Sequence, residues 1–211
     1  MNELVLYASP LSSAIPVALA LLELDVPHER IDLDLAAGDQ RKPAFLALNP
    51  NGKVPTLVID GEPMFEALAI LQWLGERFGV ERGLWPAADT AARFEALSWS
   101  TWTYVTFGGT QQRLIHATSP RFPAKCHNAA QAKLASEQLQ SHLALLEARL
   151  EGRAHLLGDA FSLLDVIVGS AVSYAAFTGV PLAAHPRVEA WVNRFTARDA
   201  YAAAWGESPA Q

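Results

Sequence analysis

The stretch that decides the fold is NPNGKVPTLVIDG, residues 49–61. Its first four residues are a dense turn signal, because Asn, Pro and Gly favour turn conformations. The apolar run at residues 54–59 is typical of a strand with a proline near its start. Asp60-Gly61 is a strong hairpin signal, and the return strand ends at Met64-Phe65. The stretch therefore predicts a turn followed by an antiparallel hairpin.

The sequence before this hairpin predicts a small mixed sheet covered by helices. Residues 3–8 have the pattern of a short apolar strand, and residues 30–35 alternate between charged and apolar side chains, as a strand does. Between them, residues 14–24 are helical in pattern, with Pro16 acceptable only in the first turn. Two strands joined through a helix indicate a right-handed parallel crossover. Further helices are predicted at residues 43–48 and 66–78.

The rest of the chain shows helical patterns only. Gly79 ends one helix, and Pro86 delays the start of the next. Helices are predicted at 90–117, 128–151, 163–179 and 186–198, with Gly108-Gly109 as a candidate break. The uncharged run at 166–184 contains Pro181, which favours a buried core helix over a membrane span. We expect a first domain at 1–79, a linker at 80–90 and a second domain at 91–211.

Charge and cysteine content argue against several classes of function. The net charge of −6 is carried by residues 1–79, with 5 Lys/Arg against 11 Asp/Glu, which argues against general nucleic-acid binding. Cys126 is the only cysteine, so an intramolecular disulfide and a four-cysteine zinc site are excluded. The histidines are scattered without ligand spacing, so we expect no metal site. No signal peptide is apparent, and a cytoplasmic protein that does not enter membranes is the expectation.

The stretch quoted above, together with FEALAI at residues 65–70, closely resembles the cytosolic glutathione transferases. The resemblance covers essentially the whole chain. It implies a thioredoxin-like α/β domain followed by an all-helical domain, with glutathione as co-substrate, a small electrophile as second substrate, and a homodimer. It also implies a cis peptide bond at Val54-Pro55, whose backbone pairs with the cysteinyl part of glutathione. An ordinary edge-strand proline is the alternative.

The resemblance assigns further glutathione-binding roles residue by residue. Glu66 matches a residue that binds the γ-glutamyl amine or amide groups. Ala67 stands where family members usually have a serine that binds the γ-glutamyl carboxylate. The alanine keeps its backbone N–H at a helix start, where an anion is favoured, but it lacks the hydroxyl donor. Lys42 and Lys53 are candidates to bind the glycyl carboxylate, and solvated surface charge is the alternative for both.

The chemistry requires a hydrogen-bond donor that keeps the glutathione thiol ionised near neutral pH. Ser12 and Ser13 suit this role by residue type and by their place before a helix. The resemblance matches Ser12 to the catalytic serine of theta- and delta-like enzymes, and Ser13 to the cysteine of beta-class bacterial enzymes. Ser9 is a further candidate, and Tyr7 is interpreted as a packing residue. A plain N-cap is the alternative for either serine.

Leu11 and an aromatic stretch at residues 99–107 are candidates to contact the electrophile. Helical spacing places Trp99, Trp102 and Thr106 on one side of their helix. The family binds its electrophile between this helix and the first domain, and aromatic side chains suit an apolar substrate. Packing in the protein core is the alternative for the tryptophans.

Ser162 and Asp165 form an S-x-x-D variant of the helix capping box, with Phe161 and Val166 as its hydrophobic staple. We expect this element to be structural rather than catalytic.

The expected function is conjugation of the glutathione thiolate to an apolar electrophile. A glutathione-dependent isomerase, dehalogenase or peroxidase is one alternative. A non-catalytic ligand-binding or interaction protein is another, and Ala67 is the feature that favours it.

Overall fold

A computed structural model describes residues 3–205 of the chain. Contacts divide the chain into two compact units, which are described separately. The first unit contains the chain up to Ala87 together with the segment from Ala197 onward, and the second unit is Ala88–Thr196. This division assigns the C-terminal segment to the first unit, whereas the sequence grouped that segment with the helical domain.

The first unit contains one four-stranded sheet and its helices. Its strands are β1 (Leu4–Ala8), β2 (Glu29–Asp32), β3 (Thr56–Ile59) and β4 (Glu62–Phe65). Its helices are α1 (Ile15–Glu23), α2 (Pro43–Leu48), α3 (Ala67–Leu74) and α9 (Asp199–Ala204). The strand order is β2-β1-β3-β4, with β1 parallel to β2 and β3 antiparallel to both β1 and β4. The predicted thioredoxin-like domain, with its parallel crossover and its hairpin, is confirmed.

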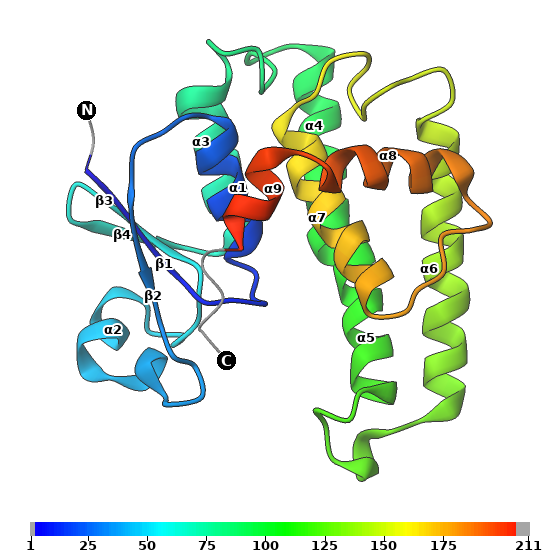
Figure 1. Cartoon of the computed structure of the whole chain (residues 1–211), viewed down its shortest axis with the longest axis horizontal. Coiled ribbons are helices and arrows are strands. Elements are labelled where there is room, and N and C mark those ends of the chain that lie inside the picture. Colours follow the sequence, from blue (N-terminus) through cyan, green and yellow to red (C-terminus); the bar gives the residue numbers. More distant parts are fainter. Residues whose placement is uncertain (1–2, 206–211) are drawn as a thin grey trace. The chain divides into compact units, whose positions relative to one another are not determined.

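Alternation along β1 explains how helices cover this sheet. Leu4, Leu6 and Ala8 are buried, whereas Val5 and Tyr7 are half-buried. In Figure 1, α1 and α3 lie side by side on one side of the sheet, and α2 lies apart from them. The ring of Tyr7 meets the ring of Phe45 in α2 edge to face, with centroids 5.5 Å apart. This contact supports the interpretation of Tyr7 as a packing residue.

The C-terminal helix α9 packs on α1 of the same unit. The guanidinium of Arg198 donates two hydrogen bonds to the carboxylate of Glu23 in α1, at 2.6 and 2.7 Å. Arg30 of β2 donates to the carbonyl of Ala204 at 2.8 Å. These contacts explain why the C-terminal segment belongs to the unit that contains the sheet.

The second unit is helical throughout its regular structure. It contains α4 (Ala91–Trp102), α5 (Gly108–Thr118), α6 (Ala129–Arg149), α7 (Leu163–Phe177) and α8 (Pro186–Thr196). Its core is built largely from leucine and valine side chains of α6, α7 and α8. Gly108-Gly109 does not break the first helix, because a π-helical segment at Thr103–Phe107 joins α4 directly to α5.

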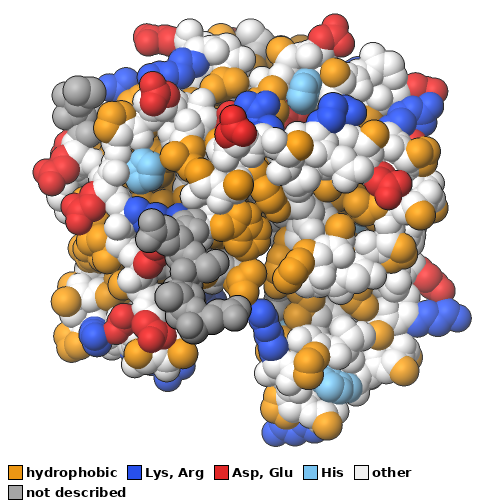
Figure 2. All heavy atoms as spheres, viewed as in Figure 1, with side chains coloured by type: hydrophobic (Ala, Val, Ile, Leu, Met, Phe, Trp, Pro, Cys, Tyr) orange, Lys and Arg blue, Asp and Glu red, His pale blue; other side chains and the backbone are white. Residues whose placement is uncertain are grey.

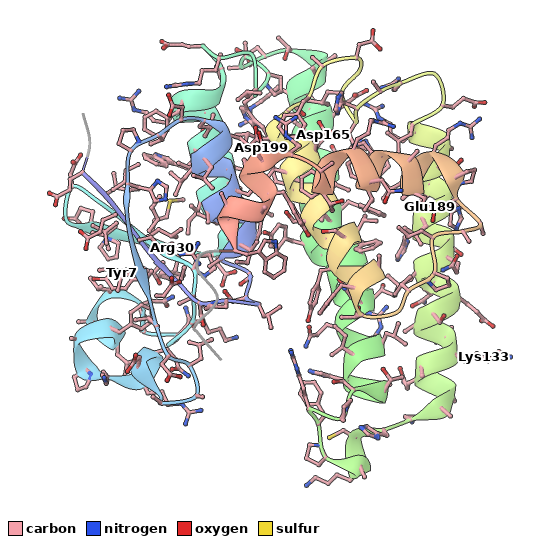
Figure 3. All side chains as sticks on the ribbon, in the orientation of Figure 1. Tyr7, Arg30, Lys133, Asp165, Glu189 and Asp199 are labelled. Carbon is pink, nitrogen blue, oxygen red and sulfur yellow. The ribbon has the colours of Figure 1, made fainter. Side chains whose placement is uncertain are left out.

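The predicted capping box at the start of α7 is confirmed. Asp165, which Figure 3 labels, is completely buried. Its carboxylate accepts hydrogen bonds from the backbone N–H and the hydroxyl of Ser162, both at 2.9 Å. It also accepts from the backbone N–H of Leu156 at 3.1 Å and from the indole N–H of Trp191 at 2.9 Å. A buried carboxylate with four donors is a structural anchor, because its charge is satisfied within the core.

Candidate functional site

Strand register brings the predicted glutathione-binding segments to one edge of the first unit. Thr56 of β3 lies opposite Phe65 of β4, so Pro55 and Glu66 leave the sheet at the same end. Thr56 also lies opposite Tyr7 of β1, so the chain that enters α1 leaves the sheet at this end too. The Val54-Pro55 peptide bond is cis, as predicted. The start of α1, the Val54-Pro55 pair and the start of α3 therefore lie near one another.

Ser12 lies in the turn between β1 and α1 and is half-buried. Its hydroxyl donates a hydrogen bond to the carbonyl of Ser9 at 2.6 Å, and its oxygen accepts one from the backbone N–H of Ala14 at 3.2 Å. The first regular turn of α1 follows Ala14, and the bond that the Ser12 oxygen accepts from the Ala14 N–H is the kind of contact that a capping serine makes. Leu11, one residue earlier, has a positive φ of 55° and a side chain that is 51% exposed.

Ser13 makes a different contact from Ser12. Ser13 is exposed, and its hydroxyl donates a hydrogen bond to the carbonyl of Val54 at 3.1 Å. This bond joins the start of α1 directly to the Val54-Pro55 pair. The two neighbouring serines thus have separate partners, one within their own turn and one across the site.

Asn49 is a site residue that the sequence analysis treated only as part of a turn. It is 2% exposed, and its side-chain amide donates to the carbonyl of Lys53 at 2.8 Å and to the hydroxyl of Thr56 at 3.0 Å. Its side-chain oxygen accepts from the backbone N–H of Asn51 at 3.0 Å. Asn49 therefore fixes the loop that leads to Val54. An asparagine that opens a turn commonly bonds the backbone two residues later, which is the signal that could have revealed this role.

Glu66 and Ala67 form the start of α3. Glu66 is exposed and has a φ of 71°, which is unusual for a residue other than glycine. Its side chain makes no capping bond to the helix, so it does not occupy the first-turn N–H groups. Ala67 is the first helical residue and is 4% exposed. This arrangement leaves backbone donors and an exposed carboxylate next to each other, which suits a ligand group that carries both an amine and a carboxylate.

The two candidate lysines differ in their contacts. The ammonium of Lys42 lies 2.6 Å from the carboxylate of Asp39. Figure 2 shows positively and negatively charged side chains close together on the surface of the region around α2. A hydrogen bond to Asp39 raises the pKa of Lys42, and the same bond lowers the pKa of Asp39. Lys53 is also exposed, and its backbone carbonyl is held by Asn49. An anion that binds Lys42 would have to share it with Asp39.

The aromatic stretch of the second unit is packed against that unit's own core. Trp99 and Trp102 are partly buried and contact the core, and their rings meet edge to face at 5.2 Å. Trp102 also contacts Phe107, at 5.7 Å, and His142, at 5.6 Å. Burial lowers the pKa of His142, and the charge of Arg113 lowers it further. Thr106 is exposed.

The helical register through this stretch differs from the prediction. Regular helical spacing would place Trp102 and Thr106 on one side, but Phe107 contacts Trp102 and is fully buried. The π-helical segment at Thr103–Phe107 explains the difference, because its wider turn delays the repeat by one residue.

Within residues 3–205, no group of three His, Cys, Asp or Glu side chains is placed to hold a metal ion. In the same part of the chain, no helix is both long enough and apolar enough to cross a membrane.

Comparison with known proteins identifies the family. Residues 8–77 match the model of the glutathione S-transferase N-terminal domain, and residues 128–194 match that of the C-terminal domain. Glutathione S-transferase 3 of Zea mays is 33% identical, over 95% of this chain and 92% of the maize protein. The chain belongs to the glutathione S-transferase family. As a member of this family, it is an enzyme of the glutathione transferase class.

Two further relatives of this glutathione transferase bear on its chemistry. A disulfide-bond oxidoreductase of Escherichia coli is 30% identical, over 92% of this chain and 91% of that protein. The solved structure of a sphingomonad glutathione S-transferase complexed with glutathione is 30% identical, with a TM-score of 0.82. The match covers 97% of this chain and 100% of the sphingomonad chain. The similarity to these relatives, in sequence and in structure, therefore confirms the glutathione transferase fold of this chain.

Proposed function

We propose that this glutathione transferase conjugates the glutathione thiolate to an apolar electrophile, with Ser12 as the hydrogen-bond donor to the sulfur. The observation that carries this proposal is the convergence of Ser12, Val54 and Glu66 at one edge of the sheet. Glutathione requires a hydrogen-bond donor for its thiolate, a backbone segment that pairs with its peptide groups, and a carboxylate that binds its γ-glutamyl amine.

Each part of glutathione has a proposed partner in the first unit. The cysteinyl backbone pairs with the peptide groups of Val54 next to Pro55, as an added strand would. The γ-glutamyl amine binds the carboxylate of Glu66, and the γ-glutamyl carboxylate binds the backbone N–H of Ala67. Lys53 and Lys42 bind the glycyl carboxylate, and Lys53 is the better candidate because Asp39 already pairs with Lys42.

Ser12 lowers the pKa of the glutathione thiol by donating a hydrogen bond to its charged form. The hydroxyl must turn from the carbonyl of Ser9 toward the sulfur to do so. The thiol releases its proton to solvent, and the thiolate then attacks an electrophilic carbon. The new sulfur–carbon bond forms as the leaving group departs with its electron pair. The protein contributes orientation and control of the thiol pKa.

We propose an apolar electrophile because an apolar side chain is available to contact it. Leu11 presents an exposed apolar side chain directly beside Ser12. We place the reaction in the cytoplasm, where glutathione is kept reduced.

Replacement of Ser12 by alanine tests this mechanism. We expect the variant Ser12→Ala to conjugate an activated aryl halide about 10- to 100-fold more slowly, because a hydrogen bond to a charged group is lost. Its pH–rate profile should move to higher pH, since the thiol loses the donor that favours ionisation. Ser141→Ala is the control, because Ser141 is an exposed serine of α6. Unchanged turnover in Ser12→Ala would refute the role of Ser12.

The relationship to the Escherichia coli disulfide-bond oxidoreductase favours a second candidate reaction of the same thiolate. Attack on a disulfide would form a mixed disulfide of glutathione and release the other sulfur as a thiolate. The chain itself has one cysteine, Cys126, so glutathione would supply the attacking sulfur. An assay with a small disulfide in place of the aryl halide separates the two reactions.

We further propose that the enzyme is a homodimer that uses one face of α4. Three exposed residues follow one another on this face at helical spacing, Phe94, Ser98 and Thr101, and Val105 is exposed in the π-helical segment that follows α4. Phe94 is 62% exposed and Val105 is 69% exposed, and none of the four is charged. An exposed uncharged face with large apolar side chains suits a protein interface.

A further inference from the structure

The hydroxyl groups of Ser12 and Ser13, just before α1, donate hydrogen bonds to different carbonyls. The hydroxyl of Ser12 donates to the carbonyl of Ser9 within its own turn, at 2.6 Å. The hydroxyl of Ser13 donates across the site to the carbonyl of Val54, at 3.1 Å. Ser13 is therefore a bridge between two segments that are distant in sequence.

Val54 is the residue whose peptide groups would pair with glutathione under the proposed function. The segment before it is fixed by Asn49, which holds the carbonyl of Lys53 at 2.8 Å. The segment after it is fixed by β3, which begins at Thr56. The carbonyl of Val54 lies between these anchors, and the hydroxyl of Ser13 holds it from the side of α1.

We propose that Ser13 is a positioning residue that orients the Val54 carbonyl for glutathione, whereas Ser12 acts on the sulfur. This role rests on the proposed function. A carbonyl oxygen has two lone pairs, so the bond from Ser13 leaves one lone pair for an N–H of the ligand. Because the carbonyl is already oriented, glutathione binding loses less conformational entropy. Ser13 should therefore affect the affinity for glutathione and not kcat.

Kinetics of two variants test this assignment. In Ser13→Ala, we expect KM for glutathione to rise about three- to tenfold, because a neutral hydrogen bond is lost. We expect kcat and the pH–rate profile to stay near the wild-type values, since Ser13 does not act on the sulfur. Ser13→Thr keeps the hydroxyl and should restore KM.

Ser141→Ala is a closely matched control for these variants. Ser141 is exposed and its hydroxyl donates to the carbonyl of Glu137 at 3.1 Å, the same distance as the bond from Ser13 to Val54. The KM of Ser141→Ala for glutathione should not change, since Ser141 and Glu137 both lie within α6.

Amide hydrogen exchange of the ligand-free protein tests the bridge without any reaction. We expect residues 49–57 to exchange about three- to tenfold faster in Ser13→Ala than in the wild type, and at the wild-type rate in Ser13→Thr. Unchanged exchange and unchanged KM in Ser13→Ala would overturn the proposal. A shifted pH–rate profile in that variant would also overturn it, because Ser13 would then act on the sulfur.

Failure of the proposed function gives a different pattern of results. If the wild type binds no glutathione, the role of Ser13 in glutathione binding is overturned together with that function. Faster exchange in Ser13→Ala would then still show that the bridge holds the loop, which separates this failure from a failure of Ser13 alone.

Discussion

At position 67, a buried methyl group stands where the family resemblance leads us to expect a serine. Ala67 is 4% exposed and begins α3, and the side chain of Glu66 leaves the first-turn N–H groups uncapped. The backbone donors for a carboxylate are therefore present, and the hydroxyl donor is missing. This difference lies in a single side chain, so its effect on glutathione binding can be measured directly.

We expect Ala67→Ser to tighten glutathione binding by about 10- to 100-fold, since a hydrogen bond to a charged group contributes about 1.5–3 kcal/mol. Calorimetric titration of the variant and the wild type measures the difference. Ala69→Ser, two residues along the same helix, is the control. Equal affinities in Ala67→Ser and the wild type would show that another group already takes the place of the hydroxyl.

Residue types at this site could be predicted from the sequence, but their hydrogen bonds could not. The cis bond at Val54-Pro55 was expected and is present. The separate partners of Ser12 and Ser13 depend on the path of the turn after β1, which residue type alone does not determine. The role of Asn49 was missed because its partners lie within a turn that the sequence signals only as irregular. The catalytic and binding roles themselves stay predictions.

Among the elements, helices and strands follow the sequence pattern closely except where the backbone geometry is irregular. Two adjacent glycines favour a helix break, since glycine gains more freedom outside a helix than other residues do. The chain nevertheless stays helical at Gly108, because the π-helical segment before it keeps Trp102 and Phe107 in contact with the core. Tertiary packing has overridden local propensity here.

The start of α7 is held by the hydrogen bonds of one buried carboxylate, that of Asp165. We expect Asp165→Asn to lower the free energy of unfolding by about 2–4 kcal/mol, because an amide nitrogen replaces an oxygen that accepts hydrogen bonds in the core. Urea unfolding followed by tryptophan fluorescence measures this loss, since Trp191 bonds the carboxylate. Asp159→Asn, at a nearby exposed residue, is the control. A midpoint within error of the wild type for Asp165→Asn would contradict the anchoring role.

For the whole molecule, the order of strands and helices was sufficient to predict the fold class. The return of the C-terminal helix to the first unit was not predicted. That return depends on contacts such as the one between Arg198 and Glu23, which lie far apart in the sequence. Periodicity reports only local neighbours, so no pattern in the sequence indicates such a pair.

Introducing a charged side chain on the exposed face of α4 tests the proposed dimer. We expect light scattering to give twice the mass of the single chain for the wild type, and the mass of the single chain for Phe94→Asp. A carboxylate at this position would be desolvated in the interface without a partner. Phe177→Asp is the control, because Phe177 is even more exposed, at 72%, and lies at the end of α7. A dimeric Phe94→Asp would rule out this face as the interface.

Calorimetric titration of the wild-type protein with reduced glutathione tests the central claim most directly. Cysteinylglycine, which lacks the γ-glutamyl group, serves as the comparison ligand because Glu66 and Ala67 are proposed to bind that group. We predict that glutathione binds in the micromolar to low-millimolar range and that cysteinylglycine binds much more weakly. Absence of glutathione binding up to several millimolar would contradict the account and would favour a ligand-binding or interaction role for this fold.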